Sequence, residues 1–178
     1  GAVAAYIDTE GVSPDRFRQV LEARADDAEA TASRVVITAA HDFDEQAEGV
    51  RDAEGFADRA DLVVLDSATG FYRLRRTEDQ GENGEALREV TRQITHLLSL
   101  ARKHDLAALV TNQVYTDPES DQARPLGGHT LTHWTGTVLK LERFRGGNRR
   151  ATLEKHRAKP AGDSARFRIT DDGLSPVD

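Results

Sequence analysis

The run from Leu62 to Ser67, LVVLDS, constrains the fold most, because it is an unbroken apolar segment that ends at an acidic residue. A short apolar run without polar alternation is typical of a strand buried on both faces inside a parallel sheet. A second strand with an acidic end, YIDTEG at Tyr6 to Gly11, lies upstream. The two segments predict an α/β fold built on parallel strands.

Short apolar runs alternate with helical stretches along the chain. The predicted strands are Ala2 to Asp8, Arg34 to Thr38, Asp61 to Asp66 and Leu106 to Thr111. Three helices are predicted. The first begins at Ser13-Pro14-Asp15, the second and weaker one spans Asp42 to Arg59, and the clearest runs from about Glu85 to His104. Strand, helix and strand in succession require right-handed crossovers, so we expect a mostly parallel sheet covered by helices on both faces.

After Gly127 the pattern changes to three short strands, Thr137 to Glu142, Arg149 to His156 and Arg166 to Thr170. Turn residues separate them, which predicts an antiparallel extension at one edge of the sheet. Two polar segments, Arg73 to Gly84 and Thr116 to Gly128, are predicted to be structureless loops. A chain of 178 residues with 38% hydrophobic content can bury one core, so we expect a single domain.

Composition narrows the class of protein. The chain has no Cys, which excludes disulfides, thiolate metal sites and Cys nucleophiles. No apolar run approaches the roughly 20 residues of a membrane span and no signal peptide is visible, so we expect a cytoplasmic protein and no membrane partner.

The charge balance is acidic, with 31 Asp and Glu against 24 Lys and Arg, and only Lys103, Lys140, Lys155 and Lys159 are lysines. This surface suits a halophile, and an ordinary acidic domain is the alternative. A net charge of −7 speaks against nucleic-acid binding in general. In a salt-adapted protein that charge reflects the solvent, so local Arg clusters are what matter for DNA.

The strand ends carry the candidate chemistry. Asp66 ends its strand where open α/β sheets bind ligands, and such an acid can orient Mg²⁺ through water. Glu10 ends the neighbouring strand and could orient water for in-line attack on a γ-phosphate. Gln113 follows LAALVT and could donate a hydrogen bond to that phosphate. The alternative for Asp66 is a solvated side chain that caps the next turn. The alternative for Glu10 is an ordinary strand-to-helix turn, and the alternative for Gln113 is a polar strand end.

A phosphate-cradling loop is missing from this picture. The 178 residues contain no G-x-x-x-x-G-K-[ST] motif. The chain also has no Met and opens on Gly1 inside a predicted strand. We therefore expect a domain that lacks its Walker A segment because its amino-terminal part is missing, and we expect poor ATP affinity.

Four motifs occur in a recognisable order: YIDTEG, LVVLDSATGFYR at 62–73, TNQV at 111–114, and LGGHTLTHWTGTVLKLER at 126–143. Together they resemble the RecA/RadA recombinase superfamily over essentially the whole chain, most closely its short archaeal RadB branch. The resemblance implies a RecA-like P-loop ATPase core that uses ATP and Mg²⁺. It implies that Glu10 polarises water, Asp66 lies on the magnesium side and Gln113 senses the γ-phosphate.

The resemblance also implies two DNA-facing loops, Arg73 to Gly84 and Thr116 to Leu126. Arg73, Arg75 and Arg76 form a compact basic cluster suited to phosphate contacts, with Tyr72 adjacent for stacking. Ion pairs with acidic residues of the same loop are the alternative: Glu78, Asp79 and Glu82. Arg124 is the only cation of the second loop, which is short and acidic. Strand exchange is therefore not expected. Filament formation is not expected either, because the amino-terminal accessory domain and the aromatic polymerisation segment of RadA have no counterpart in this sequence.

Three further features have open interpretations. Lys155 and Arg157 end a strand from which, in RecA-like assemblies, cations reach the nucleotide of a neighbouring subunit; an exposed basic strand end is the alternative. His129 and His133 lie four apart as zinc-binding pairs do, but no third ligand accompanies them, and we expect them to belong to the segment leaving the second loop. Trp134 is expected to be a packing anchor, with base stacking as the alternative.

The resulting hypothesis is an ATP-binding, DNA-binding protein of homologous recombination and DNA repair with weak DNA-associated ATPase activity. The alternative is a recombination mediator that binds DNA or a partner without significant hydrolysis. Another RecA-like ATPase is a third possibility, which the TNQV to LGGH connection opposes. The expected partners are single-stranded or junction DNA, a RadA-type recombinase or a junction resolvase, and further copies of the chain.

Overall fold

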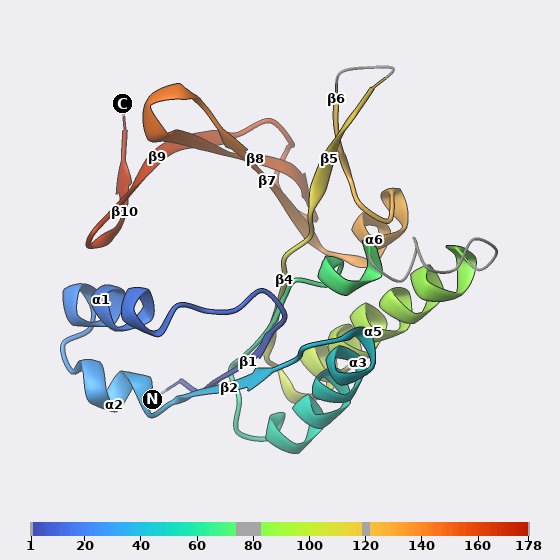
Figure 1. Cartoon of the computed structure of the whole chain (residues 1–178), viewed down its shortest axis with the longest axis horizontal. Helices are drawn as coiled ribbons and strands as arrows, with labels where there is room; N and C mark the ends of the chain where they lie inside the picture. Colours follow the sequence, from blue (N-terminus) through green and yellow to red (C-terminus); the bar gives the residue numbers. More distant parts are fainter. Residues whose placement is uncertain (1, 74–82, 119–121, 178) are drawn as a thin grey trace. The chain divides into compact units, whose positions relative to one another are not determined.

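The computed structural model describes residues 2–73, 83–118 and 122–177. The chain divides into two compact units, of which the first comprises residues 1–12 and 33–134 and the second comprises residues 13–32 and 135–178. Each unit contains its own four-stranded sheet (Figure 1). No helix in the described ranges combines the length and apolar character needed to cross a membrane.

The sheet of the first unit is parallel. Its strands are β1 (Ala4–Asp8), β2 (Val35–Ala39), β3 (Leu62–Asp66) and β4 (Ala107–Val110), in the order β2-β1-β3-β4. All three pairings are parallel, and Asp8 is in register with Asp66. The four predicted strands and their parallel arrangement are confirmed, with slightly different ends. Because parallel strands end at one edge, β1 and β3 bring their acidic ends to the same place.

Two helices cover one face of this sheet, and Figure 1 shows them side by side: α3 (Phe43–Asp52) and α5 (Asn83–His104). Gly49 of α3 lies against the side chains of Ile7 and Thr38, which fixes the covered face. The core between the sheet and the helices includes Ile7, Val63, Leu65, Val50, Val90, Ile94 and Leu97. The predicted helix at Glu85 to His104 is therefore confirmed.

The weaker predicted helix, Asp42 to Arg59, is shorter than expected. Asp42 caps α3 by accepting hydrogen bonds from the backbone N–H groups of Asp44 and Glu45. After Asp52 the chain tightens into the 3-10 helix η1 (Ala53–Phe56). Gly55 lies within that turn, and glycine lowers helix stability, which accounts for the early end of α3.

The burial of a strand's side chains depends on whether the strand has a neighbour on both sides. Strand β3 has a neighbour on each side, and Val63 and Leu65 are fully buried. Strand β4 pairs only with β3 among the described strands, and Leu109 is 52% exposed. The interpretation of LVVLD as a strand buried on both faces is therefore right for β3, and it does not extend to β4.

The predicted loop at Thr116 to Gly128 is partly wrong. An antiparallel hairpin of β5 (Val114–Asp117) and β6 (Gln122–Pro125) occupies most of it, followed by α6 (His129–Trp134). Val114, Tyr115 and Thr116 are β-branched or aromatic and favour a strand, which the polar composition of the rest obscured. In the other predicted loop, Arg73 belongs to the helical residues 70–73, Asn83 and Gly84 begin α5, and 74–82 lie outside the described residues.

The second unit joins α1 (Pro14–Arg24) and α2 (Ala28–Ala32) to an antiparallel sheet. The sheet consists of β7 (Thr137–Arg143), β8 (Asn148–His156), β9 (Ser164–Thr170) and β10 (Gly173–Pro176), with the 3-10 turn η2 (Arg145–Gly147) between β7 and β8. The three predicted strands are confirmed. Strand β10, GLSP, was not predicted, because its sequence carries no strand pattern.

The antiparallel strands pair in the order β10-β9-β8-β7 and form a sheet of their own. The expectation that they would extend the parallel sheet at its edge is therefore wrong for the strands that the structure describes. Helix α1 begins as predicted, with the Ser13 hydroxyl accepting a hydrogen bond from the Arg16 N–H at 3.3 Å. Arg16 and Arg24 then donate to backbone carbonyls of β9, β10 and their turn, which ties α1 to this sheet.

Candidate functional site

Glu10 and Gln113 meet at the carboxyl edge of the parallel sheet, as the sequence predicted. Gln113 Nε2 donates a hydrogen bond to Glu10 Oε1 at 2.9 Å. Ser67 Oγ, from the residue that follows β3, donates to the same oxygen at 2.8 Å. Three segments far apart in the sequence thus converge on one carboxylate oxygen.

Asp66 ends β3 beside this contact, and both of its carboxylate oxygens accept hydrogen bonds. The Tyr6 hydroxyl donates to Oδ2, and the Thr111 hydroxyl donates to Oδ1. Burial raises the pKa of Tyr6 above its ordinary value, and the hydrogen bond and the negative charge of Asp66 raise it further. The carboxylate is therefore held in one orientation, with Tyr6 kept as a neutral donor.

The turn that carries Glu10 is shaped by Asp8, which is buried. Its carboxylate accepts from three backbone N–H groups, those of Glu10 at 3.2 Å, Gly11 at 2.8 Å and Val12 at 2.7 Å. Gly11 has φ of 83°, a left-handed conformation that glycine adopts without strain. This role of Asp8 was not predicted from the sequence, although an Asp shortly before a Gly is a recognised turn signal.

The residues after Asp66 form a second network that the sequence analysis also missed. The peptide bond between Asp66 and Ser67 is cis, and the Ser67 N–H donates to Thr9 Oγ1 at 2.6 Å. Gly70 packs so closely that a Cβ there would lie 3.0 Å from Glu10 Oε1. The segment SATG is therefore fitted against Glu10, and its small residues were the available signal.

Asn112 and Thr69 connect this network to β4. Thr69 Oγ1 donates to Asn112 Oδ1 at 2.6 Å and accepts from the Gln113 N–H at 3.2 Å. Asn112 Nδ2 donates to the carbonyl of Leu126 at 3.1 Å. Side chains from both strand ends thus fix the backbone that presents Gln113.

The donor set of this edge suits a hydrated hard cation. Carboxylate oxygens are what Mg²⁺ prefers, and it usually keeps several waters and shares substrate phosphates. Across residues 2–73, 83–118 and 122–177, no group of three or more His, Cys, Asp or Glu residues could hold a metal by itself. Asp66 is the carboxylate at this edge that would hold such an ion through water. His129 and His133 both lie on α6 but gain no further ligand there.

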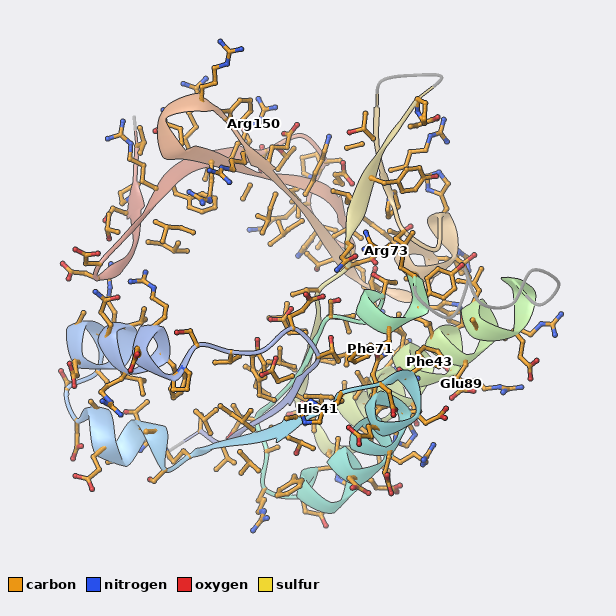
Figure 2. The ribbon with its side chains drawn as sticks, in the orientation of Figure 1. His41, Phe43, Phe71, Arg73, Glu89 and Arg150 are labelled. Atoms are coloured by element: carbon orange, nitrogen blue, oxygen red, sulfur yellow. The ribbon has the colours of Figure 1, made fainter. Side chains whose placement is uncertain are left out.

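Two of the predicted DNA-binding residues, Arg73 and Arg124, lie within the described ranges. Arg73 is exposed at the end of the helical residues 70–73 (Figure 2). Arg75 and Arg76 lie outside the described residues, as do the acidic residues suggested as their ion-pair partners. Arg124 of β6 forms an ion pair across the hairpin with Asp117, with Nε and Oδ2 2.7 Å apart.

The remaining candidates fall in different places. Lys155 lies near the end of β8 and Arg157 follows it, both in the second unit. The Arg157 side chain packs over Gly136, where a Cβ would lie 3.0 Å from Nε. Trp134 is 43% exposed and contacts the ring of His133 edge-on. The expectation that Trp134 is a packing anchor is therefore wrong, because almost half of it faces solvent.

The comparison with known families agrees with this geometry. The family model described as Rad51 matches residues 1–177, nearly the whole chain. The chain belongs to the Rad51 family. The predicted resemblance and the RecA-like fold are confirmed. The Rad51 family is a family of nucleotide-binding proteins.

Individual relatives are similar over the same range. A protein of Halobacterium salinarum named "DNA repair and recombination protein RadB" is 68% identical over 98% of this chain and 74% of its own length. A Pyrococcus abyssi protein of the same name is 39% identical, covering 97% of this chain and 73% of its own length. The Halobacterium relative agrees with the halophile interpretation of the acidic composition.

A solved structure gives the fold match independently. The chain resembles the crystal structure of the RadB recombinase with a TM-score of 0.85 and 35% identity, covering 100% of this chain and 80% of that one. The fold of this chain is therefore that of a solved recombinase structure.

Proposed function

We propose that this chain is part of an ATP-binding and DNA-binding protein of homologous recombination and DNA repair. The relatives named as DNA repair and recombination proteins and the membership of the Rad51 family support this function. The observation that carries the nucleotide assignment is the convergence of Glu10, Ser67 and Gln113 beside Asp66 at one sheet edge. We propose that the protein acts in the cytoplasm.

The contacts support a role for each residue. ATP with Mg²⁺ supplies the phosphoanhydride bond and the cation when bound. Asp66, held by Tyr6 and Thr111, would hold Mg²⁺ through water. Glu10 accepts a hydrogen bond from a water positioned for in-line attack. Gln113 exchanges its hydrogen bond to Glu10 for one to the γ-phosphate, which couples nucleotide to the hairpin that follows.

The missing phosphate-binding motif decides which protein is suitable for measuring ATP turnover. The 178 residues contain no G-x-x-x-x-G-K-[ST], so they should bind ATP poorly by themselves. The curated relatives are longer than the matched region, which covers about three quarters of the Halobacterium protein. The product of the complete gene is therefore the appropriate protein for measuring turnover. Lys155 and Arg157 are proposed to reach nucleotide across a subunit contact.

DNA contact is proposed for Arg73, Arg75 and Arg76, with Arg124 in a lesser role because Asp117 pairs with it. The single cation of an acidic hairpin gives little electrostatic grip on a phosphate backbone. Single-stranded or junction DNA, a RadA-type recombinase, a junction resolvase and further copies of the chain are the proposed partners.

A second candidate function is a mediator that binds DNA or a recombination partner without significant hydrolysis. The Arg124–Asp117 ion pair favours it, because the hairpin then offers no unpaired cation to hold a single strand. The contacts around Glu10 favour retained ATP chemistry.

The deciding experiment compares Glu10→Gln with Glu22→Gln in the complete protein. Glu22 is exposed on α1, so the control makes the same chemical change in a different environment. We expect ATP turnover to fall by about a hundredfold for Glu10→Gln and not for the control, because general base catalysis contributes about that much. Unchanged turnover in both variants would remove the catalytic assignment of Glu10, whereas no measurable turnover in the unmodified protein would leave the mediator.

A parallel experiment tests the DNA assignment. Arg73, Arg75 and Arg76 are changed together to Ala, and exposed Arg18, Arg102 and Arg143 are changed in a charge-matched control. We expect the first variant to lose affinity for single-stranded DNA and to show a shallower salt dependence, since fewer counterions are released. Equal losses in both variants would mean that only net charge matters.

A further inference from the structure

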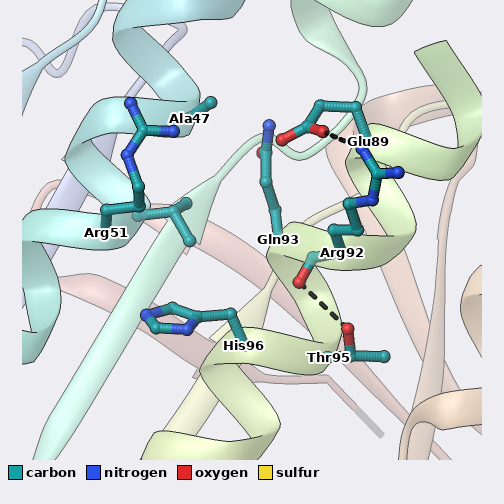
Figure 3. A pocket seen from close by; sticks show the side chains of 8 residues that line it. Ala47, Arg51, Glu89, Arg92, Gln93, Thr95 and His96 are labelled. Atoms are coloured by element: carbon teal, nitrogen blue, oxygen red, sulfur yellow. Dashed lines mark hydrogen bonds and ion pairs between the residues drawn. The ribbon is translucent and has the colours of Figure 1, made fainter. Parts of the chain in front are cut away.

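A hollow of about 440 Å³ lies between α3 and α5 in the first unit, away from the residues assigned above (Figure 3). Its lining includes Ala47, Val50, Arg51, Glu89, Gln93 and His96. Its volume falls within the roughly 300 to 1,000 Å³ typical of small-ligand sites. This hollow is called the α3–α5 pocket below.

Gln93 is the unusual member of this lining, because its side chain is only 3% exposed yet lines the α3–α5 pocket. Its orientation is fixed from behind. Gln46 Nε2 donates to the carbonyl of Ala68 at 3.2 Å and to Gln93 Oε1 at 2.7 Å. Since a carbonyl can only accept, the amide of Gln46 must face Ala68, and the oxygen of Gln93 must face Gln46.

The consequence is that Gln93 Nε2 is directed away from Gln46 and needs an acceptor. No residue in the described parts of the chain accepts a hydrogen bond from it. A buried donor without an acceptor is costly and rare in proteins. The same holds for His96 Nε2, which is also buried without a described partner. Figure 3 shows Gln93 between Arg51 of α3 and Glu89 of α5.

The charged and polar side chains around Gln93 offer mostly donors. Arg51 and Arg92 carry positive charge, and Glu89 is paired with Arg92 at 3.1 Å. The Thr95 hydroxyl is directed to backbone carbonyls of its own helix. The lining therefore has a net positive charge in a chain whose net charge is −7. A complementary ligand must bring acceptors and negative charge.

We infer that the α3–α5 pocket binds a carboxylate on a short apolar stem. A carboxylate offers two planar oxygens, which suit an amide donor and a guanidinium fork together. Ala47 and Val50 form an apolar wall against which a few methylene groups can pack. A small dicarboxylate and an acidic side chain of another protein share this chemistry.

The pocket is also connected to the candidate nucleotide site. Gln46 joins Gln93 to the carbonyl of Ala68, whose own N–H donates to the carbonyl of Thr111 at 3.0 Å. The preceding residue, Ser67, holds Glu10. A carboxylate that takes the amide of Gln93 therefore acts on the segment after β3, whose Ser67 donates to Glu10. This regulatory consequence rests on the proposed function, whereas binding itself does not.

The test is a titration of the ¹⁵N-labelled chain followed by the side-chain amide resonance of Gln93. Glutarate, a short peptide with one Glu, and inorganic phosphate are compared at constant chloride and ionic strength. We expect glutarate and the peptide to shift this resonance saturably and phosphate not to. A shift with the peptide alone supports a protein as the source of the carboxylate. No shift with either carboxylate, or an equal shift with phosphate, overturns the inference.

Variants sharpen the result. Gln93→Met removes both donors at similar volume, and Gln19→Met makes the same change on exposed α1. We expect glutarate affinity, followed by the His96 ring resonances, to fall at least about tenfold for Gln93→Met only, as for loss of a hydrogen bond to a charged group. Arg51→Gln, at an exposed position that carries little folding risk, should weaken binding about threefold. Unaltered affinity in both Gln93→Met and Arg51→Gln contradicts the site.

The connection has its own readout, the backbone amide of Ala68. In the unmodified chain it should shift in step with Gln93 as glutarate saturates the pocket. A fixed Ala68 resonance overturns the connection while binding stands. Failure of the Glu10→Gln turnover experiment would leave both of these readouts unchanged, so the two proposals fail separately.

Discussion

The two sheets of this chain differ in how deeply they bury their leucine side chains. Leu65 of the parallel sheet is 0% exposed, whereas Leu141 of the antiparallel sheet is 65% exposed. The two sheets also differ in where their polar side chains meet. Parallel strands end at one edge and collect distant side chains there, whereas polar residues of the antiparallel sheet form cross-strand pairs such as Glu142 with Arg150. Strand direction therefore decides where a shared polar site can form.

The largest expected difference between the sheets is in the cost of truncating a leucine. Leu65→Ala should lower the free energy of unfolding by about 3 kcal/mol, because it leaves a cavity in a packed core. Leu141→Ala removes a side chain already mostly in solvent and should cost less than about 1 kcal/mol. Urea unfolding in concentrated salt measures both. Equal losses would show that Leu141 is covered in solution and would contradict the difference in burial between the two sheets.

The next effect concerns the turn at the edge of the parallel sheet. Asp8→Ala removes an acceptor of three backbone hydrogen bonds and should cost about 2 kcal/mol. Asp15→Ala, in the exposed first turn of α1, is the matched control and should cost about 0.5 kcal/mol. The same urea measurement applies. If Asp8→Ala costs no more than the control, the turn is held by other contacts and Glu10 does not depend on Asp8.

A smaller effect tests how Asp66 is held. Tyr6→Phe should cost about 1 kcal/mol at neutral pH, the value of one net hydrogen bond. The pKa of Tyr6 is raised in the folded state, so its contribution is fully present below the unfolded pKa of about 10 and is lost as pH rises from there through the folded pKa. The unmodified protein should therefore lose more stability than the variant above about pH 10.

Stability measured between pH 8 and 12 checks this expectation, with Tyr115→Phe as the control because Tyr115 is exposed on β5. Parallel alkaline curves for the unmodified protein and Tyr6→Phe would show that Tyr6 ionises as freely when folded as when unfolded. The hydrogen bond to Asp66 would then be absent in solution.

The smallest effect belongs to the antiparallel sheet. The hydrogen bond from Arg150 lowers the pKa of Glu142, with Lys140 adding to it. A lowered folded pKa gives stability that is present above the unfolded pKa of about 4.3 and is lost as pH falls through the folded value. The side chains of Arg150 and Glu142 are 37% and 28% exposed, so solvent screens the pair and Arg150→Gln should barely change the urea midpoint at pH 7 or at pH 3. A clear loss confined to pH 7 would mean that this sheet, too, depends on a polar site.

The parallel part of the fold could be predicted because its signals are local. The apolar run before Asp66 and the acidic end at Glu10 define strands, and parallel pairing then brings their ends together. The hairpin from Val114 to Pro125 could not, because its polar residues hid a pairing that depends on register. The missed strand β10 depends on β9 for its hydrogen bonds and has no pattern of its own.

The same distinction holds for the site. Glu10, Asp66 and Gln113 were predicted because each ends a strand. Asp8, Ser67 and Thr111 act by hydrogen bonds that depend on side-chain geometry, and no spacing in the sequence encodes it. Gln93 and Gln46 face each other from two helices, and helical periodicity alone marks such positions only as partly buried.

The most direct test of the central claim uses Mn²⁺ with ATP as a paramagnetic probe of the complete, ¹⁵N-labelled protein. Unpaired electrons broaden the resonances of nuclei close to the bound ion. The account predicts the strongest broadening at the backbone amides of Asp66, Ser67 and Glu10 and at the side-chain amide of Gln113, with Gln19 of α1 unaffected. Broadening centred elsewhere, or none at saturating nucleotide, would contradict the assignment of this sheet edge.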